Sequence, residues 1–498
     1  MANVLFRFSV FSISLFQVLS AASGGSYSRV KFLPGFSGPL PFLLETGYVG
    51  VGDSEEIQLF HYSVESEGNP QTDPLLLWLT GGPGCSTLSG LAFEIGPIRF
   101  KEELYNGSLP ELILDPHSWT KKSSIIFVDL PMGTGFSYST TSEERKPGDF
   151  NQIHHALQFL RKWLVDHPKF ISNPFYVGGD SYSGIIVPIL VQEILEGNKH
   201  IFPFINFKGY ILGNPITIRG SNENFAIPFA HSKTLISDEL FESLKTSCKG
   251  EYVNIDPSNV ECLRHYNTYE KCISQVSEGC ILRPKCVLPS SNQHDIFGRR
   301  SLYNTPVHPG CVSYKYLLSY DWANDDQVQR ALHIREGSIG EWIRCKKKDY
   351  QYEIKSVFPY HVNLSSKGYR SLIYSGDHDM MVPSMDTQAW IKSLNYSIVD
   401  DWRPWFIEDQ VAGDIFSTAR LSSSLSIRKE KSGGDFAKAK LKSMFSEPTF
   451  NVVMRIVAGK RFYGEGILCS EMENAKDPYG VRWTPMACRG RGCTEGVQ

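Results

Sequence analysis

A serine lies in this sequence where a strand would end and a helix would begin. Residues 175–188 read Phe-Tyr-Val-Gly-Gly-Asp-Ser-Tyr-Ser-Gly-Ile-Ile-Val-Pro. The β-prone start and the apolar run 185–194 predict a strand, a sharp turn at Ser181 and a buried helix. Such a turn lifts a hydroxyl above a parallel sheet and directs the next backbone N–H at an oxyanion. We therefore interpret Ser181 as a nucleophile, although a Gly- and Ser-rich segment of this kind can also be only a turn.

A nucleophilic serine also needs a second oxyanion donor and an acid. The loop Gly81-Gly82-Pro83-Gly84 follows an early apolar run, and glycine lets the backbone come close to a substrate. We predict Gly82 and Tyr182 as the two oxyanion donors. In α/β-hydrolases the acid follows the serine in the chain, after a late strand. Asp379 has that place, with Asp377 as the alternative.

The histidine that should complete this triad is missing from the sequence. His378 is the last of the 13 histidines and adjoins the predicted acid itself, which makes it a poor base. Earlier histidines, such as His231 and His265, are more typical of surface or helix positions. Loss of a triad member usually lowers the rate by about 10⁴ to 10⁶.

Composition limits the possible partners and the compartment. The chain has 498 residues, 41% of them hydrophobic, which is ample for a core, and a net charge of -3. Nothing in this balance indicates a nucleic acid or a membrane surface as partner. Residues 1–23 have the pattern of a secretory signal peptide, with cleavage near Ala22 or Ser23. The apolar run is short for a bilayer span, and an uncleaved anchor is the alternative.

Eleven cysteines fit an oxidising compartment. They lack a His-rich ligand spacing, so we expect disulfides rather than a metal site, and no cofactor. Asn106, Asn363 and Asn395 each begin an Asn-X-Ser triplet and are predicted glycosylation sites.

Apolar runs that alternate with helical periodicity predict an α/β fold with a mainly parallel sheet and helices on both faces. The strands are expected at 57–64, 74–79, 124–130, 175–177, 207–213 and from 371 on, with helices at 154–167 and 185–194. Residues from about 216 to 319 are rich in Cys, Asn, Pro and Ser with poor hydrophobic periodicity. We interpret them as a disulfide-stapled insertion over one end of the sheet.

Four motifs in this order resemble the serine carboxypeptidase-like family: 77–86, 93–97, 179–184 and 373–383. The likeness covers about 30–413 and implies an α/β-hydrolase domain, 24–413, that contains the insertion. The family pattern also implies the disulfides Cys85–Cys345, Cys248–Cys262 and Cys286–Cys311, with Cys272 and Cys280 as a possible further pair.

Two positions depart from the peptidase pattern. Thr80 stands where peptidases have an asparagine that holds the substrate's terminal carboxylate, beside Gly81. Asp180 stands where they have a glutamate, with Glu94 as its expected partner carboxyl. Both departures resemble the plant branch that moves an acyl group from a 1-O-glucose ester to an acceptor alcohol through an acyl-Ser181 intermediate. The alternative is a carboxypeptidase acting on peptide C-termini. Either enzyme would be secreted or vacuolar.

The sequence changes character after Gly413. Residues from about 414 to 466 resemble an internal helical segment of plant cytochrome P450s, but the haem-binding cysteine loop of that family is absent, so no haem is inferred. We interpret 414–498 as an atypical tail, truncated or replaced, from a fused or mis-spliced gene. A diverged end of the same domain is the alternative. The resulting chain would lack the last strand and the histidine loop, which leaves a catalytically inactive product as a third functional hypothesis.

Overall fold

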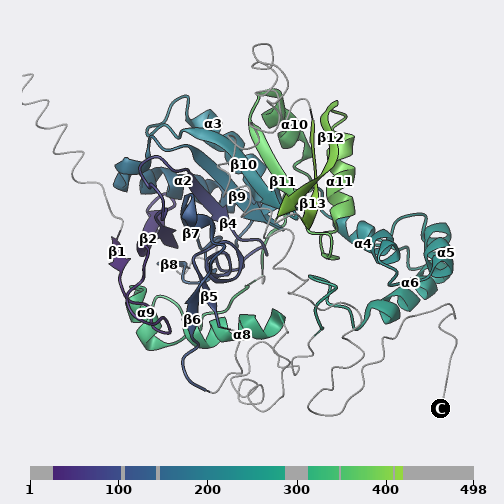
Figure 1. The fold of residues 1–498 in the computed structure, drawn as a ribbon, viewed down its shortest axis with the longest axis horizontal. Coiled ribbons are helices and arrows are strands. Elements are labelled where there is room, and N and C mark those ends of the chain that lie inside the picture. Colours follow the sequence, from purple (N-terminus) through teal and green to yellow (C-terminus); the bar gives the residue numbers. More distant parts are fainter. Residues whose placement is uncertain are drawn as a thin grey trace, which may run out of the picture.

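The computed structural model describes residues 26–101, 107–141, 146–285, 312–346, 349–407 and 410–418. A large twisted sheet runs through the middle of the molecule (Figure 1). Its eight main strands lie in the order β1 (Ser26–Val30), β2 (Leu44–Val51), β3 (Ile57–Val64), β7 (Ser124–Val128), β4 (Leu75–Leu79), β9 (Phe175–Asp180), β10 (Phe207–Gly213) and β11 (Arg370–Tyr374).

The central strands are parallel and the first strands are antiparallel. β7, β4, β9, β10 and β11 run in one direction, whereas β1, β2 and β3 form an antiparallel end to which β8 (Tyr138–Ser139) adds. All five residues of β4 and of β7 are buried, as continuous apolar runs in a parallel sheet predict. The expected strands at 57–64 and 207–213 agree with β3 and β10 at both ends.

Helices cover both faces of the sheet, which confirms the predicted fold class. One apolar core joins the sheet to α2 (Asp149–Asp166) and α3 (Ser183–Gly197). The opposite core joins it to α8 (Val312–Ala323), α9 (Asp326–Ala331) and the short helix Gly90–Glu94, around Trp78, Trp119 and Phe127. Further elements at the edges are the short helices Trp119–Lys121 and Pro168–Phe170, the small sheet of β5 (Ile98–Phe100) and β6 (Leu112–Leu114), and the helices α10 (Phe358–Ser366) and α11 (Ser384–Ser393).

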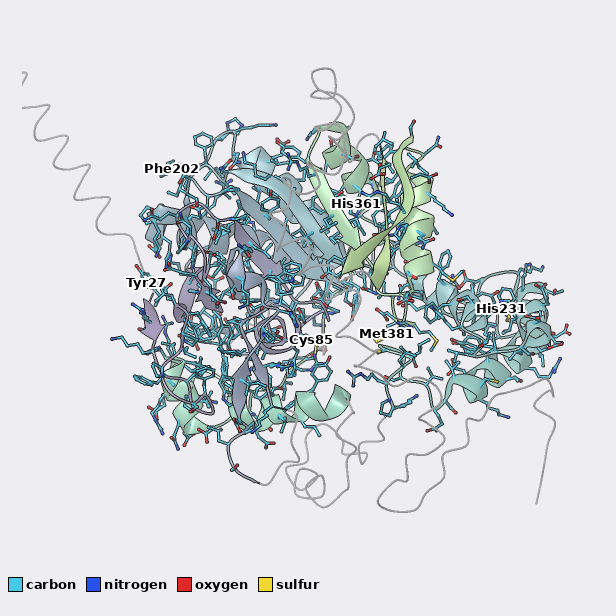
Figure 2. All side chains as sticks on the ribbon, viewed as in Figure 1. Tyr27, Cys85, Phe202, His231, His361 and Met381 are labelled. Carbon is cyan, nitrogen blue, oxygen red and sulfur yellow. A yellow bond between two sulfur atoms is a disulfide. The ribbon has the colours of Figure 1, made fainter. Side chains whose placement is uncertain are left out.

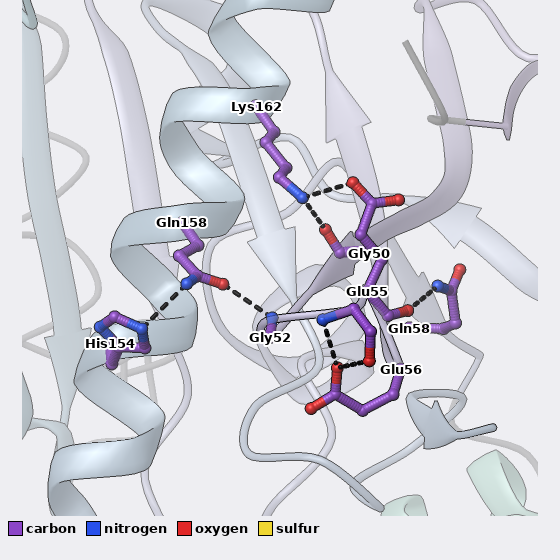
Figure 3. A network of polar contacts seen from close by, with 9 residues as sticks. Gly50, Gly52, Glu55, Glu56, Gln58, His154, Gln158 and Lys162 are labelled. Atoms are coloured by element: carbon purple, nitrogen blue, oxygen red, sulfur yellow. Dashed lines mark hydrogen bonds and ion pairs between the residues drawn. The ribbon is translucent and has the colours of Figure 1, made fainter. Parts of the chain in front are cut away.

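Polar contacts fix α2 to the turn between β2 and β3 (Figure 3). The Lys162 ammonium donates to the Gly50 carbonyl at 2.8 Å and to the Glu55 carboxylate at 2.7 Å. One turn earlier, the Gln158 side-chain oxygen accepts from the Gly52 amide at 2.7 Å. These bonds hold the middle of α2 against this turn.

The expected insertion is more helical than its sequence suggests. It contains α4 (Ser221–Ser232), α5 (Asp238–Cys248) and α6 (Val260–Ile273), which pack around their own apolar cluster. Figure 1 shows them beside the sheet, beyond α11. The sequence did not predict these helices because each buries only a few residues along one side. The helix α5, for example, buries only Leu244 and Cys248.

Two further strands, β12 (Ile398–Ile407) and β13 (Gln410–Thr418), form a separate antiparallel pair. In this pair Gly413 lies opposite Trp405 and Asp414 opposite Pro404. The strand therefore continues across the boundary at 413 that the sequence indicated. The remaining tail, 419–498, lies outside the described residues. Within the described part of the chain, no helix is long and apolar enough to span a bilayer.

Candidate active site

Ser181 lies at the sharp turn between β9 and α3, as the sequence predicts. Its φ of +54° places a non-glycine residue in the left-handed region, a conformation that persists only where the surroundings enforce it. The Ser181 amide donates to the Gly213 carbonyl at 2.9 Å, and the Ser181 carbonyl accepts from the Ile216 amide at 3.0 Å. Backbone bonds to the end of the next strand therefore enforce the turn.

Close packing leaves no room for side chains around this turn. A Cβ atom on Gly179 would lie 2.3 Å from the Leu79 carbonyl oxygen and from the Ser183 hydroxyl. A Cβ on Gly81 would lie 2.8 Å from the Ser181 Cβ and 3.1 Å from the Tyr182 nitrogen. The glycine loop thus lies directly against the turn, which brings the Gly82 and Tyr182 segments together as a candidate oxyanion site.

The glycine loop is clamped by a distant part of the chain. The disulfide Cys85–Cys345 joins it to the segment before β11. Beside it the Ser86 amide donates to the Arg344 carbonyl at 2.6 Å, and the Lys346 amide donates to the Gly84 carbonyl at 2.8 Å. This clamp carries the Arg344 side chain to the site.

Asp180 and Glu94 form an electrostatically coupled pair of carboxyl groups. The Asp180 carboxylate accepts from the Gly81 amide at 3.0 Å, and the Glu94 carboxylate accepts from the Trp78 indole N–H at 2.8 Å. Burial raises the pKa of Asp180 to about 6. Burial and, second, the charge of Asp180 hold the pKa of Glu94 well above its usual range. Two carboxyls whose charges act on each other in this way hold a shared proton more tightly than a lone exposed carboxyl does.

Three residues of this site, Arg344, Tyr316 and Tyr374, were not predicted from the sequence. The Arg344 guanidinium lies 3.9 Å from the centre of the Tyr316 ring, and its charge acts to lower the pKa values of both Asp180 and Glu94. Burial and then these two carboxylates hold the pKa of Tyr374 well above its usual range. The three residues are distant in the sequence from the turn. Only the expected Cys85–Cys345 link could have pointed to Arg344.

The predicted acid Asp379 is held in place and partly shielded. One of its carboxylate oxygens accepts from the Met381 and Val382 amides at 2.8 and 3.1 Å, and the other accepts from the Asn214 amide at 2.9 Å. Burial raises its pKa to about 6, and the charge of Asp180 adds to this rise, so the two carboxyls belong to one electrostatic site.

The alternative acid, Asp377, lies on the surface. Its side chain is 68% exposed and pairs with Lys233 at 3.4 Å and with the His378 ring at 2.8 Å. This contrast favours Asp379 as the residue that would orient a base.

No histidine in the described ranges hydrogen bonds to the Ser181 hydroxyl or to the Asp379 carboxylate. Eight of the described histidines have other partners: His61 with Ser63, His154 with Gln158, His167 with Glu45, His231 with Asp238, His265 with Ser247, His333 with Thr46, His361 with Tyr210, and His378 with Asp377. His231 and His265, the earlier candidates, both lie in the insertion. His294 and His308 are outside the described residues.

Tyr182 is anchored by a buried carboxylate that the sequence did not reveal. Asp149, the first residue of α2, accepts from the Tyr182 and Tyr350 hydroxyls, each at 2.7 Å. Its second oxygen accepts from the Glu353 and Ile354 amides, each at 2.8 Å. Through this network α2 fixes the residue whose N–H is the predicted oxyanion donor.

The disulfide and glycosylation expectations have mixed outcomes. Cys85–Cys345 and Cys248–Cys262 are present, whereas the possible pair of Cys272 and Cys280 is wrong because these two are not bonded. Cys286 and Cys311 lie outside the described residues.

Of the predicted glycosylation sites, Asn106 is also outside the described residues. The Asn363 side chain, within α10, donates to the Gln192 side chain at 2.8 Å, whereas Asn395 is exposed after α11. The structure thus presents Asn395 more openly than Asn363.

A strained serine turn over a mainly parallel sheet, a glycine loop against it and an acid after a later strand together define an α/β-hydrolase. Residues 34–432 match the serine carboxypeptidase family (peptidase S10), and the chain belongs to that family. The match extends past residue 413.

Plant relatives support this assignment, and one solved structure supports the fold. Serine carboxypeptidase-like 7 of Arabidopsis thaliana is 52% identical over 436 residues, covering 87% of this chain and 95% of that protein. Serine carboxypeptidase-like 13 of the same plant is 50% identical over 434 residues, with coverage of 87% and 95%. The Saccharomyces cerevisiae carboxypeptidase Kex1 is similar in fold, with a TM-score of 0.61 at 19% identity over 78% of this chain and 88% of that one.

Proposed function

We propose that this chain has the active site of an acyltransferase that moves an acyl group from a 1-O-glucose ester to an acceptor alcohol. The observation that carries the proposal concerns two residues beside the serine turn, Asp180 and Thr80. The aspartate before the nucleophile is hydrogen bonded to Gly81 and coupled to Glu94. The neighbouring Thr80 hydroxyl is buried without a partner in the described structure. Thr80 also stands where peptidases have the asparagine that holds a terminal carboxylate, so this site lacks that carboxylate-binding amide.

The reaction would proceed in two steps, acylation and then deacylation of Ser181. The Ser181 oxygen attacks the ester carbonyl, its proton passes to a base, and the sugar leaves as the free alcohol after protonation. The acceptor hydroxyl then attacks acyl-Ser181, which yields the new ester and restores the serine. The backbone N–H groups of Gly82 and Tyr182 would stabilise the oxyanion in both steps, and Asp379 would orient the base.

This site has no identified general base among the described residues. No histidine of the described residues contacts the serine, and none follows His378 in the sequence. We therefore expect the chain to form acyl-Ser181 about 10⁴ to 10⁶ times more slowly than the same domain with a histidine in place.

A direct comparison of substrates tests the proposal. Purified protein would be given a glucose ester with an alcohol and, separately, a blocked dipeptide. Two forms would be compared: the chain as it stands, and a version whose sequence after residue 413 is replaced by a histidine-bearing family segment. Ester transfer by the restored form, lost in Ser181→Ala, is the expected result. Peptide cleavage without transfer would instead support the carboxypeptidase alternative.

The third hypothesis, an inactive product, has its own test. If the restored form transfers acyl groups and the chain as it stands equals its Ser181→Ala variant, the histidine-less chain binds substrate at most. Sequencing of full-length transcripts across the Gly413–Asp414 junction shows whether such a chain is made. We also propose, from the signal-like first 23 residues, that the protein enters the secretory pathway and is secreted or vacuolar.

A further inference from the structure

The segment between α3 and β10, together with the first two residues of β10, exposes an unusual amount of apolar surface. We call these residues, 199–208, the 199–208 loop. Within it the exposed fractions are 47% for Ile201, 73% for Phe202 and 60% for Phe204. Figure 2 shows Phe202 at the rim of the molecule, on the side away from the insertion that carries His231. Single exposed apolar residues are ordinary, but three within four positions form a patch.

This exposure is built into the backbone of the loop. The Arg161 guanidinium, on α2, donates to the carbonyls of Ile201 and Pro203 at 3.1 and 2.9 Å. The Asn198 side chain donates to the Ile205 carbonyl at 2.8 Å and accepts from the Ile205 amide at 3.1 Å.

Anchoring of the backbone forces the side chains to alternate. Pro203 and Ile205 point into the protein and are buried, so Phe202 and Phe204 must point out. Arg161 is itself only 8% exposed, and its hydrogen bonds go to backbone carbonyls. The two phenyl rings are thus held outward by a firm backbone, and binding through them costs little ordering entropy.

The charge around the patch is positive. The loop contains Lys199 and Lys208 and no acidic residue. Lys199 contacts Glu196 at the end of α3, and Lys367 lies 3.9 Å from the same carboxylate, so two cations meet one anion there. Exposed aromatic rings flanked by lysines are the combination that anchors proteins at anionic lipid surfaces, where rings enter the headgroup region and cations meet lipid phosphates. The net charge of -3, from which we expected no membrane partner, averages over the whole chain and hides this local arrangement.

A second protein chain is a weaker candidate for this surface. A stable dimer buries about 800 Å² on each partner, from 20 or more residues, whereas the patch consists of three side chains. A lipid surface needs only a few inserted side chains.

The position of the loop also matters for the site. It leads into β10, whose first residue Phe207 lies opposite the first residue of β9, Phe175. Ser181 follows the other end of β9. The loop and the serine turn therefore lie at opposite ends of the parallel strands.

We propose that the 199–208 loop attaches the protein reversibly to anionic bilayer surfaces, with Phe202 and Phe204 inserted at headgroup depth. Attachment at this end of the strands leaves the serine turn, at the other end, facing the aqueous phase. This inference does not depend on the proposed acyl transfer.

Vesicle flotation of the full chain tests it, with phosphatidylcholine vesicles alone or mixed with phosphatidylglycerol. The wild type should float with the mixed vesicles, and Phe202→Ser with Phe204→Ser should weaken binding about tenfold or more. The matched control is Phe32→Ser with Phe150→Ser, which removes two aromatic rings that are 64% and 54% exposed elsewhere, and should bind like the wild type. Lys199→Gln with Lys208→Gln should weaken binding only to the mixed vesicles.

Three results would overturn the proposal. They are a wild type that does not float with either vesicle, a loop variant that floats as well as the wild type, and a loop variant whose main change is in self-association measured by light scattering. The last result would assign the patch to contact between proteins. Thermal melting of both double variants shows whether either has lost its fold.

Discussion

The two halves of the candidate site are built in different ways. The nucleophile half lies on β9, between β4 and β10 in the interior of the sheet. The acid half follows β11, which pairs with β10 and forms the edge of the described sheet. All five residues of β4 are buried, whereas all five residues of β11 are only partly buried.

This difference changes what holds each of the two predicted catalytic groups, Ser181 and Asp379. Backbone bonds and close packing against Leu79 and Gly213 enforce the turn at Ser181. Asp379 relies instead on one asparagine side chain and on its own loop. The neighbouring Met380 is 2% exposed and packs in the apolar cluster of the insertion. The position of the acid therefore depends on the insertion, whereas that of the nucleophile depends on the core of the sheet.

The largest expected effect comes from replacing a glycine by alanine, once beside the interior strand β4 and once beside the edge strand β11. In Gly179→Ala the new Cβ meets the Leu79 carbonyl at 2.3 Å, between two interior strands that cannot move apart, and we expect a loss of about 3 kcal/mol in unfolding free energy. In Gly209→Ala the Cβ meets the Arg370 carbonyl at 2.8 Å on the edge strand β11, which can shift, so the loss should be about 1 kcal/mol.

Urea unfolding of the two glycine variants measures this contrast. Because both substitutions add one methyl group in a strand, their propensity effects are matched. Equal losses would show that β11 is held as firmly as the interior strands, and the comparison between the two halves would be wrong.

The nucleophile half was also the half that sequence could predict. The turn around Ser181 is encoded within about ten consecutive residues, and the buried strands are continuous apolar runs, so local pattern and tertiary position agree. Asp379 was predicted as the acid for the same reason, since it shortly follows a strand pattern. Its surface neighbour Asp377 could be set aside only when burial was known.

The unpredicted parts of the site depend on contacts between distant segments. Asp149 meets Tyr182 across 33 positions, and Arg344 reaches the carboxyl pair through a disulfide that spans 260. The helices of the insertion were missed because α5 and α6 are polar overall and bury only a few residues each, although those residues lie on one face. Short, mostly polar segments rich in Cys, Asn and Ser are hard to tell from loops by composition.

A middle-sized effect is expected from the residue that holds the acid. Asn214→Gly removes the amide that donates to Asp379 at 2.9 Å and should lower the unfolding free energy by about 1–2 kcal/mol. Asn214 has a φ of +42°, which glycine tolerates and alanine does not, so Asn214→Ala should cost more than Asn214→Gly. The difference between these variants isolates backbone strain from the lost hydrogen bond.

Asn206→Ala is the control for the lost amide. It removes a hydrogen bond of 2.9 Å to the Ser172 carbonyl, outside the site, and should cost about 0.5–1 kcal/mol. Thermal unfolding compares the three variants with the wild type. An Asn214→Gly variant as stable as the wild type would mean that the loop alone holds Asp379, without help from β10.

The remaining expected effect is a change in the pH dependence of stability. The pKa of Asp180 is raised from 3.8 to about 6, so the folded protein holds this proton at pH values where the unfolded chain has lost it. Stability from this group is therefore complete below pH 3.8, falls as the pH rises towards about 6, and is lost above that. Asp180→Asn removes the titration while its side-chain oxygen can still accept from Gly81, and should reduce the fall in urea midpoint across this window. Asp377→Asn, at a carboxyl that is 68% exposed, is the control and should leave the fall unchanged. If Asp180→Asn and Asp377→Asn have the same pH profile, Asp180 is solvated, and the nucleophile half of the site is no more enclosed than the acid half.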